Sequence, residues 1–228
     1  MSVFDHAEFD NHESLHYFFD EKTGLRAIIA VHSTALGPAA GGTRRWVYAS
    51  DADALTDVLR LSRGMTYKNA VAGLKFGGGK AVILASADTP KSPELFKAYG
   101  RCVNELSGRY VTAEDVGCSV DDMRYVREET GFVSGLPHDE GVAGGDPSPW
   151  TAIGCFEGIL AAVDARLGKH SVKGLRVAVQ GVGHVGAHLC RMLHEGGAEL
   201  TVSDVNRDNI EAVSAEMPVT VVAPSELL

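Results

Sequence analysis

One stretch of this chain indicates its architecture most directly: Leu175-Arg176-Val177-Ala178-Val179-Gln180-Gly181-Val182-Gly183-His184-Val185-Gly186. The apolar, β-branched first half is typical of a buried strand, and helical spacing follows from Val185 to Leu193. Further strands are predicted from Glu199 to Ser203 and from Val219 to Ala223. Strands that alternate with helices predict an α/β fold built on a parallel sheet.

The glycines of this stretch have the G-x-G-x-x-G spacing of a Rossmann dinucleotide-binding fold. A lone match is weak, but this one lies between a strand and a helix, and Asp204 follows at about the usual 20-residue interval. Gly181 allows the tight turn, Gly183 lets a pyrophosphate approach the helix N-terminus, and Gly186 lets the helix pack closely. Asp204 would bind the adenosine ribose and repel a 2′-phosphate, which favours NAD over NADP although Arg207 is near in sequence. The cofactor-binding candidates are therefore Gly181, Gly183, His184, Val185, Gly186 and Asp204.

A second glycine-rich stretch lies upstream: Met65-Thr66-Tyr67-Lys68-Asn69-Ala70-Val71-Ala72-Gly73-Leu74-Lys75-Phe76-Gly77-Gly78-Gly79-Lys80. Three consecutive glycines indicate a place where main chain approaches another group closely, and Lys80 follows them. Because a lysine near another cation loses its proton readily, Lys80 beside Lys68 is a candidate neutral base. A P-loop is excluded, since Leu74 stands where its first glycine should be and Ala81 replaces the magnesium-binding Ser or Thr. The alternative is a solvated glycine loop that ends in a surface lysine.

The first 145 residues also alternate between strand and helix signals, which predicts an α/β domain of their own. The predicted strands are Leu15–Asp20 and Leu25–His32, which form a hairpin, Lys80–Leu84 and Arg109–Ala113. The predicted helices begin at the capping residues Ser50, Ser92 and Ser119. Residues 141–149 are dense in glycine and proline, so we expect a boundary that gives domains 1–145 and 146–228, with a helix resuming from Thr151 to Leu167.

Composition narrows the class of protein. The 228 residues suffice for two ordinary domains, and 45% hydrophobic with 22% charged residues is typical of globular proteins. A net charge of −9 disfavours nucleic acid as a partner. The sequence has no apolar run of about 18 residues and no signal-peptide pattern, so we expect a cytoplasmic protein with no membrane partner. No close cysteine pair suggests a metal site or redox dithiol, and we expect buried free thiols at Cys102, Cys118, Cys155 and Cys190.

Together these motifs resemble the amino-acid dehydrogenases that act on glutamate, leucine, phenylalanine and valine, most closely the leucine dehydrogenase branch. The resemblance covers essentially the whole chain. Besides the two glycine-rich stretches, it is carried by Gly37-Pro38-Ala39-Ala40-Gly41-Gly42-Thr43-Arg44, Thr112-Ala113-Glu114-Asp115-Val116-Gly117 and Pro147-Ser148-Pro149-Trp150-Thr151-Ala152. It implies an N-terminal substrate domain, a Rossmann domain, a homo-oligomer, and oxidative deamination of an L-amino acid to a 2-oxo acid and ammonia with reduction of NAD.

The resemblance also implies roles for individual residues. Lys80 is the expected catalytic lysine with Asp115 as its acidic partner, and Lys68 is expected to bind the substrate carboxylate. The substrate pocket is expected to be lined by Ala40, Gly41, Gly42, Met65 and Ala113. Thr151 is expected to touch the nicotinamide. Glutamate-specific relatives have a lysine at the position of Ala40, so an aliphatic or aromatic substrate is expected. Without the resemblance, Asp115 could instead be only the cap of the helix near Ser119.

Two other functions fit parts of the sequence. His12-Glu13-Ser14-Leu15-His16 matches the H-E-x-x-H pattern of zinc peptidases, but that pattern holds zinc only on a helix. Because the segment leads into the run Tyr17-Phe18-Phe19, we expect a strand, with two solvated histidines. The other alternative is a non-catalytic NAD-binding or regulatory module.

The end of the sequence leads to one more expectation. The span from Gly174 supplies only one mononucleotide half of a doubly wound dinucleotide domain, the half for adenosine. We therefore expect a shortened form of the enzyme, with an exposed strand edge after Val219 to Ala223 that favours aggregation or self-pairing.

Overall fold

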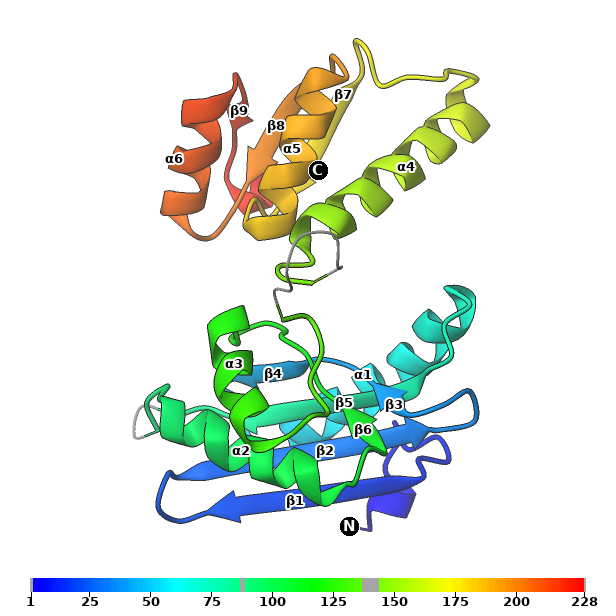
Figure 1. Ribbon diagram of the computed structural model, residues 1–228. Coiled ribbons are helices and arrows are strands. Elements are labelled where there is room, and N and C mark those ends of the chain that lie inside the picture. Colours follow the sequence, from blue (N-terminus) through cyan, green and yellow to red (C-terminus); the bar gives the residue numbers. More distant parts are fainter. Residues whose placement is uncertain (1, 87–88, 137–143, 228) are drawn as a thin grey trace. The chain divides into compact units, whose positions relative to one another are not determined.

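The computed structural model describes residues 2–86, 89–136 and 144–227. The chain separates into two compact units, Met1–Gly145 and Asp146–Leu228 (Figure 1). Both units combine helices with a sheet, so the predicted α/β class is confirmed. Within the described ranges, no helix has the length and apolar character needed to cross a membrane.

The first unit is built on a six-stranded sheet whose central strand is β5 (Gly77–Leu84). Strands β1 (Ser14–Asp20) and β2 (Leu25–Ser33) form the predicted hairpin, and β2 pairs antiparallel with β5. The other edge of β5 is shared by two short strands that run parallel to it, β3 (Ala39–Ala40) and β4 (Thr43–Trp46). Strand β6 (Tyr110–Val111) pairs parallel with β3.

Helices cover both faces of this sheet (Figure 1). Helix α1 (Asp51–Val71) packs on one face, where Ile28, Ala30 and Val82 meet Ala54 and Val58. On the other face, helices α2 (Pro93–Glu105) and α3 (Val120–Glu129) bury the alternate residues of β2. This alternation follows from the strand period of two residues.

The three predicted helix starts are confirmed. Ser50 accepts a hydrogen bond from the Asp53 N–H, and Ser92 accepts one from the Leu95 N–H. Ser119 forms a capping box with Asp122. Ser119, rather than Asp115, therefore caps α3.

The second unit has a parallel sheet in the order β7 (Arg176–Gln180), β8 (Glu199–Ser203), β9 (Thr220–Val221). Its helices are α4 (Ser148–Leu167), α5 (His184–Glu195) and α6 (Arg207–Glu216). Short 3₁₀ turns, Val3–Asp5 and Pro224–Glu226, complete the elements of the two units. Gly168, with φ of 63°, ends α4 in the left-handed conformation that glycine adopts most easily.

The structure corrects several details of the sequence analysis. The predicted strand Lys80–Leu84 begins three residues earlier, at Gly77, because its glycines pair with β2 and β3. Helix α4 begins at Ser148 instead of Thr151, so the connector is shorter, and residues 137–143 lie outside the described ranges. The predicted strand Arg109–Ala113 is reduced to two residues. The four cysteines are free, but Cys155 is exposed and Cys118 only partly buried.

The H-E-x-x-H segment does not form a helix. Ser14, Leu15 and His16 belong to β1, as predicted. The expectation of two solvated histidines was wrong for His12, which is buried with Nε2 3.0 Å from the Leu59 carbonyl oxygen. The described residues contain no group of three or more His, Cys, Asp or Glu side chains placed to hold a metal ion.

Candidate functional site

The candidate site lies where one edge of β5 changes its partner. Strand β3 pairs with Gly77 and Gly78, whereas β4 pairs with the residues from Ala81 onward. The link between β3 and β4 is the Gly41-Gly42 pair, which therefore faces the Gly79-Lys80 step of β5. The break in the ladder places the Gly41-Gly42 pair beside the stretch Gly77-Gly78-Gly79-Lys80.

The glycines allow the main chain of three elements to lie close to one another. A Cβ on Gly78 would lie 2.0 Å from the Thr66 Oγ1 and 2.2 Å from the Thr66 nitrogen, so only glycine lets α1 rest on β5 here. A Cβ on Gly41 would lie 1.8 Å from the Gly79 carbonyl oxygen and 3.1 Å from the Met65 Cγ. The predicted close approach is present, and the groups approached belong to the protein itself.

Lys80, which is buried, and Asp115, which is partly buried, form an ion pair beside this break. The Lys80 Nζ lies 2.9 Å from the Asp115 Oδ2, and the exposed fractions of the two side chains are 7% and 25%. Burial lowers the pKa of Lys80 from its ordinary value, although Asp115 opposes this effect. Burial also acts to raise the pKa of Asp115, but Lys80 and Arg44 hold it below its ordinary value. The site therefore combines a lysine that gives up its proton readily with an ionised carboxylate.

Arg44 is also part of this site, although no sequence pattern indicates it. Its Nε donates to the Asp115 Oδ2 at 3.2 Å, and its positive charge adds to the lowering of the Lys80 pKa. The sequence suggested Lys68 for that electrostatic effect. Arg44 is the last residue of the motif Gly37–Arg44, but only the fold brings its side chain to Asp115.

The other predicted substrate residues lie on elements that adjoin the break. Met65 is half-buried against Gly41, and Lys68 lies three residues later on α1 with an exposed side chain. Ala40 is the last residue of β3 and pairs with Gly78 and Val111. The Ala113 carbonyl accepts a hydrogen bond from the Thr43 N–H at 2.8 Å.

In the second unit, the G-x-G-x-x-G stretch forms the turn between β7 and α5. Gly181 has φ of 86°, and its N–H donates to the Ser203 carbonyl at 2.7 Å. A Cβ on Gly186 would lie 2.0 Å from the Gly181 carbonyl oxygen, so glycine is required for this tight packing. Gly183 is the N-cap of α5 and provides no capping side chain, and His184 and Val185 open the helix. Helix N–H groups at such an end attract anions.

Asp204 stands at the end of β8 and closes this turn. Its Oδ2 accepts hydrogen bonds from the Val182 N–H at 2.8 Å and the Asn209 amide at 3.2 Å. Hydrogen bonds, first that from the Asn206 N–H, lower the pKa of Asp204 and keep it ionised. A carboxylate has further lone pairs for ribose hydroxyls, so the turn fits a dinucleotide. Thr151 lies in the first turn of α4, where its hydroxyl donates to the Pro147 carbonyl.

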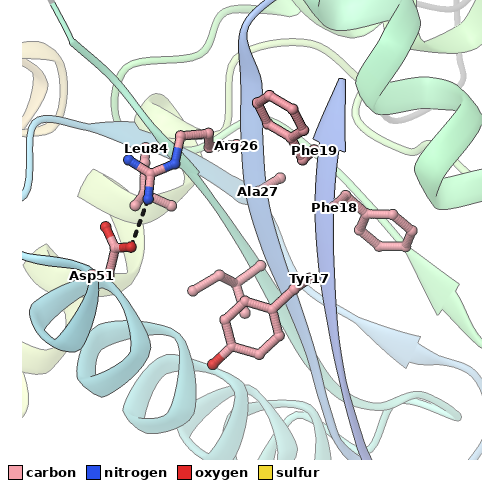
Figure 2. Close-up of a pocket in the computed structure, with 8 residues that line it drawn as sticks. Tyr17, Phe18, Phe19, Arg26, Ala27, Asp51 and Leu84 are labelled. Atoms are coloured by element: carbon pink, nitrogen blue, oxygen red, sulfur yellow. Dashed lines mark hydrogen bonds and ion pairs between the residues drawn. The ribbon is translucent and has the colours of Figure 1, made fainter. Parts of the chain in front are cut away.

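A separate pocket of about 260 Å³ is lined by residues of β1 and β2, with Asp51 and Leu84. Figure 2 shows Arg26 and Asp51 joined across 2.6 Å on one side and the aromatic side chains of β1 on the other. Its charged groups are thus paired with each other and exposed. This pocket contains neither Lys80 nor Asp115 and is not the candidate active site.

The comparisons with known proteins agree on one class. Residues 12–131 match the family model described as Glu/Leu/Phe/Val dehydrogenase, dimerisation domain. The chain belongs to this family.

Several individual dehydrogenases are similar to this chain in sequence or in structure. The chain is 47% identical over 227 residues to a leucine dehydrogenase of Bacillus subtilis, with 100% of this chain and 62% of that protein covered. It is 47% identical to a valine dehydrogenase of Streptomyces virginiae, covering 98% of this chain and 62% of that protein. The crystal structure of L-tryptophan dehydrogenase from Nostoc punctiforme matches with a TM-score of 0.68 and 44% identity, covering 95% of this chain and 60% of that one. The chain thus spans about three fifths of the length of these relatives.

Proposed function

We propose that this chain carries out NAD-dependent oxidative deamination of an apolar L-amino acid, giving the 2-oxo acid and ammonia. The observation that carries the proposal is the Lys80–Asp115 ion pair at the break between β3 and β4. Residues 1–145 are assigned as the substrate domain and residues 146–228 as the NAD-binding Rossmann domain. The names of the related leucine, valine and tryptophan dehydrogenases support this class of reaction.

The proposed substrate contacts are these. Lys68 binds the carboxylate, and the pocket for the side chain includes Ala40, Met65 and Ala113, with main chain at Gly41 and Gly42. Ala40 offers no cation to a γ-carboxylate, and burying one unpaired would cost several kcal/mol. A leucine side chain would instead gain about 2 kcal/mol from burial. We therefore propose an aliphatic or aromatic substrate.

Lys80 and Asp115 provide the acid–base chemistry. Oxidation of the amino acid leaves an iminium that water must attack, and neutral Lys80 takes a proton from that water. Asp115 exchanges a proton with the substrate amine. Burial lowers the pKa of Lys80 from its ordinary value, which supports this role because a lowered pKa makes the neutral amine easier to form.

NAD, when bound, supplies the hydride acceptor. The residues proposed to hold it are Gly181, Gly183, His184, Val185, Gly186, Asp204 and Thr151. The glycine turn, the uncapped start of α5 and the ionised Asp204 support this assignment.

The test measures NADH formation by the 228-residue chain with L-leucine, L-valine, L-phenylalanine and L-glutamate, and repeats it with NADP. We expect turnover with an apolar amino acid and NAD. Faster turnover of glutamate would contradict the proposed substrate class. Calorimetry of NAD and leucine separates the alternatives, because binding of NAD without turnover would favour a non-catalytic module.

We also propose that the protein is a homo-oligomer. The family model is that of a dimerisation domain, and β1 lies at the edge of the sheet with Tyr17 and Phe19 exposed by 62% and 72%. Exposed aromatic side chains on an edge strand favour association. Light scattering should give a multiple of 24.2 kDa, whereas a monomer at micromolar concentration would contradict the proposal.

A further inference from the structure

The Lys80–Asp115 pair belongs to a larger charged network that reaches α1. Arg44 contacts two carboxylates through different nitrogens: its Nε donates to Asp115, and its Nη1 donates to both oxygens of Asp57, the shorter distance being 2.9 Å. The Tyr48 hydroxyl donates to the Asp57 Oδ2 at 2.8 Å. Both partners of Arg44 are mostly buried, since their side chains are 25% and 27% exposed.

The backbone fixes Arg44 opposite Asp115. The residues on either side of Arg44 donate hydrogen bonds to the Asp115 segment: Thr43 to the Ala113 carbonyl at 2.8 Å and Arg45 to the Val116 carbonyl at 2.9 Å. Arg44 itself pairs with Val82 of β5, two residues after Lys80. Strands β4 and β5 thus fix the position of Arg44, and Asp57 of helix α1 forms an ion pair with its guanidinium.

The two cations contact the same oxygen of Asp115. The shortest contacts of Lys80 and Arg44 with Asp115 are 2.9 Å and 3.2 Å, and both are to Oδ2. The Val116 backbone N–H also favours the ionised carboxylate. A carboxylate held on one side by a planar, forked guanidinium cannot rotate without breaking charge-assisted hydrogen bonds. Such an arrangement orients the other oxygen.

We propose that Arg44 is a positioning residue that, anchored by Asp57 and Tyr48, holds the Asp115 carboxylate through Oδ2 and leaves Oδ1 to exchange a proton with the substrate amine. The proton-exchange part of this inference rests on the proposed function. Without Arg44, Asp115 would lose one of the two cations that hold its Oδ2 and would keep Lys80 as its paired cation. This loss acts on the acid–base pair in two ways, on its geometry and on its proton affinity.

The charged and titratable groups around Arg44 come from several elements. From β5 there is Lys80, from the segment before α3 Asp115, and from α1 Asp57; Asp53 and Arg60 of α1 line the same hollow, with Tyr48. Removing the Arg44 charge therefore leaves Asp115 and Asp57 facing one fewer cation, which raises the pKa of Lys80.

The experiment titrates Lys80 directly, by NMR of lysines labelled at the ε-carbon, in the wild type and in Arg44→Met, Arg44→Lys and Asp57→Asn. It also measures kcat as a function of pH. In Arg44→Met, Lys80 should titrate closer to the ordinary lysine value and kcat at neutral pH should fall about tenfold or more. Arg44→Lys should restore most of the titration but not kcat, because one ammonium cannot reproduce the fork to Asp115 and Asp57. In Asp57→Asn, which keeps Arg44 but removes its anchor, kcat should also fall.

The matched control is Arg124→Met, which removes an exposed arginine from an ion pair with Asp121 and should change neither measurement. Arg44→Met with unchanged Lys80 titration, or Arg44→Lys with full kcat, would overturn the inference. If Arg44→Met does not fold, kcat of Arg44→Lys and of Asp57→Asn tests the inference, and full kcat in both variants would overturn it. A wild type without turnover contradicts the proposed function and with it the proton exchange at Oδ1, whereas the Lys80 titration still decides whether Arg44 controls the pair.

Discussion

Substituting Gly42 by alanine tests whether the glycine pair sets the position of Asp115. A Cβ on residue 42 would lie 2.4 Å from the Glu114 carbonyl oxygen and 3.0 Å from the Asp115 Cβ. An ordinary carbon–oxygen contact is about 3.3 Å, so the segment that carries Asp115 must move by about 0.9 Å. We expect this movement to separate Asp115 from Lys80.

The displacement gives the magnitude. Misplacing a reacting group by about 1 Å lowers rates about 100-fold, which corresponds to about 2.7 kcal/mol at the transition state. Overpacking should also destabilise the first unit by about 1–3 kcal/mol. The glycine turn of the second unit is not altered by the substitution, so NAD affinity should change little.

Steady-state kinetics and thermal unfolding measure both effects. Gly64→Ala is the control, because a Cβ there meets nothing within 4 Å among the described residues, and the position is inside α1. Alanine in a helix interior should stabilise the protein by about 0.5–1 kcal/mol and leave kcat unchanged. If Gly42→Ala kept kcat within about threefold of the wild type, contact between Gly42 and the Asp115 segment would not control the reaction.

Four further outcomes are expected. Lys80→Ala should lower kcat by at least about 100-fold with NAD affinity intact in calorimetry, and a residual rate above about a tenth would exclude Lys80 as the base. Lys68→Ala should chiefly raise the KM for the amino acid, and a change confined to kcat would contradict carboxylate binding. Asp204→Ser should reduce the preference for NAD over NADP, measured as the ratio of kcat/KM values, and an unchanged ratio would remove Asp204 from cofactor selection. Burial lowers the pKa of His12, so stability should fall as the pH drops below about 6.5 toward the folded-state pKa, where the unfolded chain binds the extra proton. His12→Gln should flatten this dependence in thermal unfolding, and an equally steep profile would assign the effect to other groups.

The parts of the fold that sequence predicted well are those with local causes. Ser50, Ser92 and Ser119 were identified as helix starts because a capping side chain and the N–H groups that it binds are three residues apart. The parallel strands at Arg176–Gln180 and Glu199–Ser203 were predicted nearly to the residue, since each is a short apolar run between clear turn signals.

Features that depend on distant partners were harder to predict. Gly77 to Gly79 carry no strand propensity of their own, yet they are strand residues because β2 and β3 supply hydrogen-bonding partners. His12 was expected to be solvated because nothing nearby in sequence covers it, whereas Leu59 and Ser62 of α1 do so in the fold. The role of Arg44 depends on the pairing of β4 with both β5 and the Asp115 segment, a register that no local pattern indicates. The role of Asp115 follows from the family resemblance, whereas Lys80 is also indicated by the glycines before it, and both roles remain predictions.

If Lys80 is the base that we propose, the network around it explains why burial alone would not be enough. Burial alone disfavours the charged lysine, and a single carboxylate at 2.9 Å favours it strongly, so a simple Lys–Asp pair would hold its proton. Arg44 weakens that hold by sharing the same carboxylate oxygen, and Asp57 balances the charge of Arg44. While Lys80 is protonated, two cations and two carboxylates leave no net charge to bury. The proton affinity of Lys80 therefore depends on the competition for Asp115 as well as on burial, and in the proposed reaction the strand register that joins Arg44 to Asp115 contributes to catalysis.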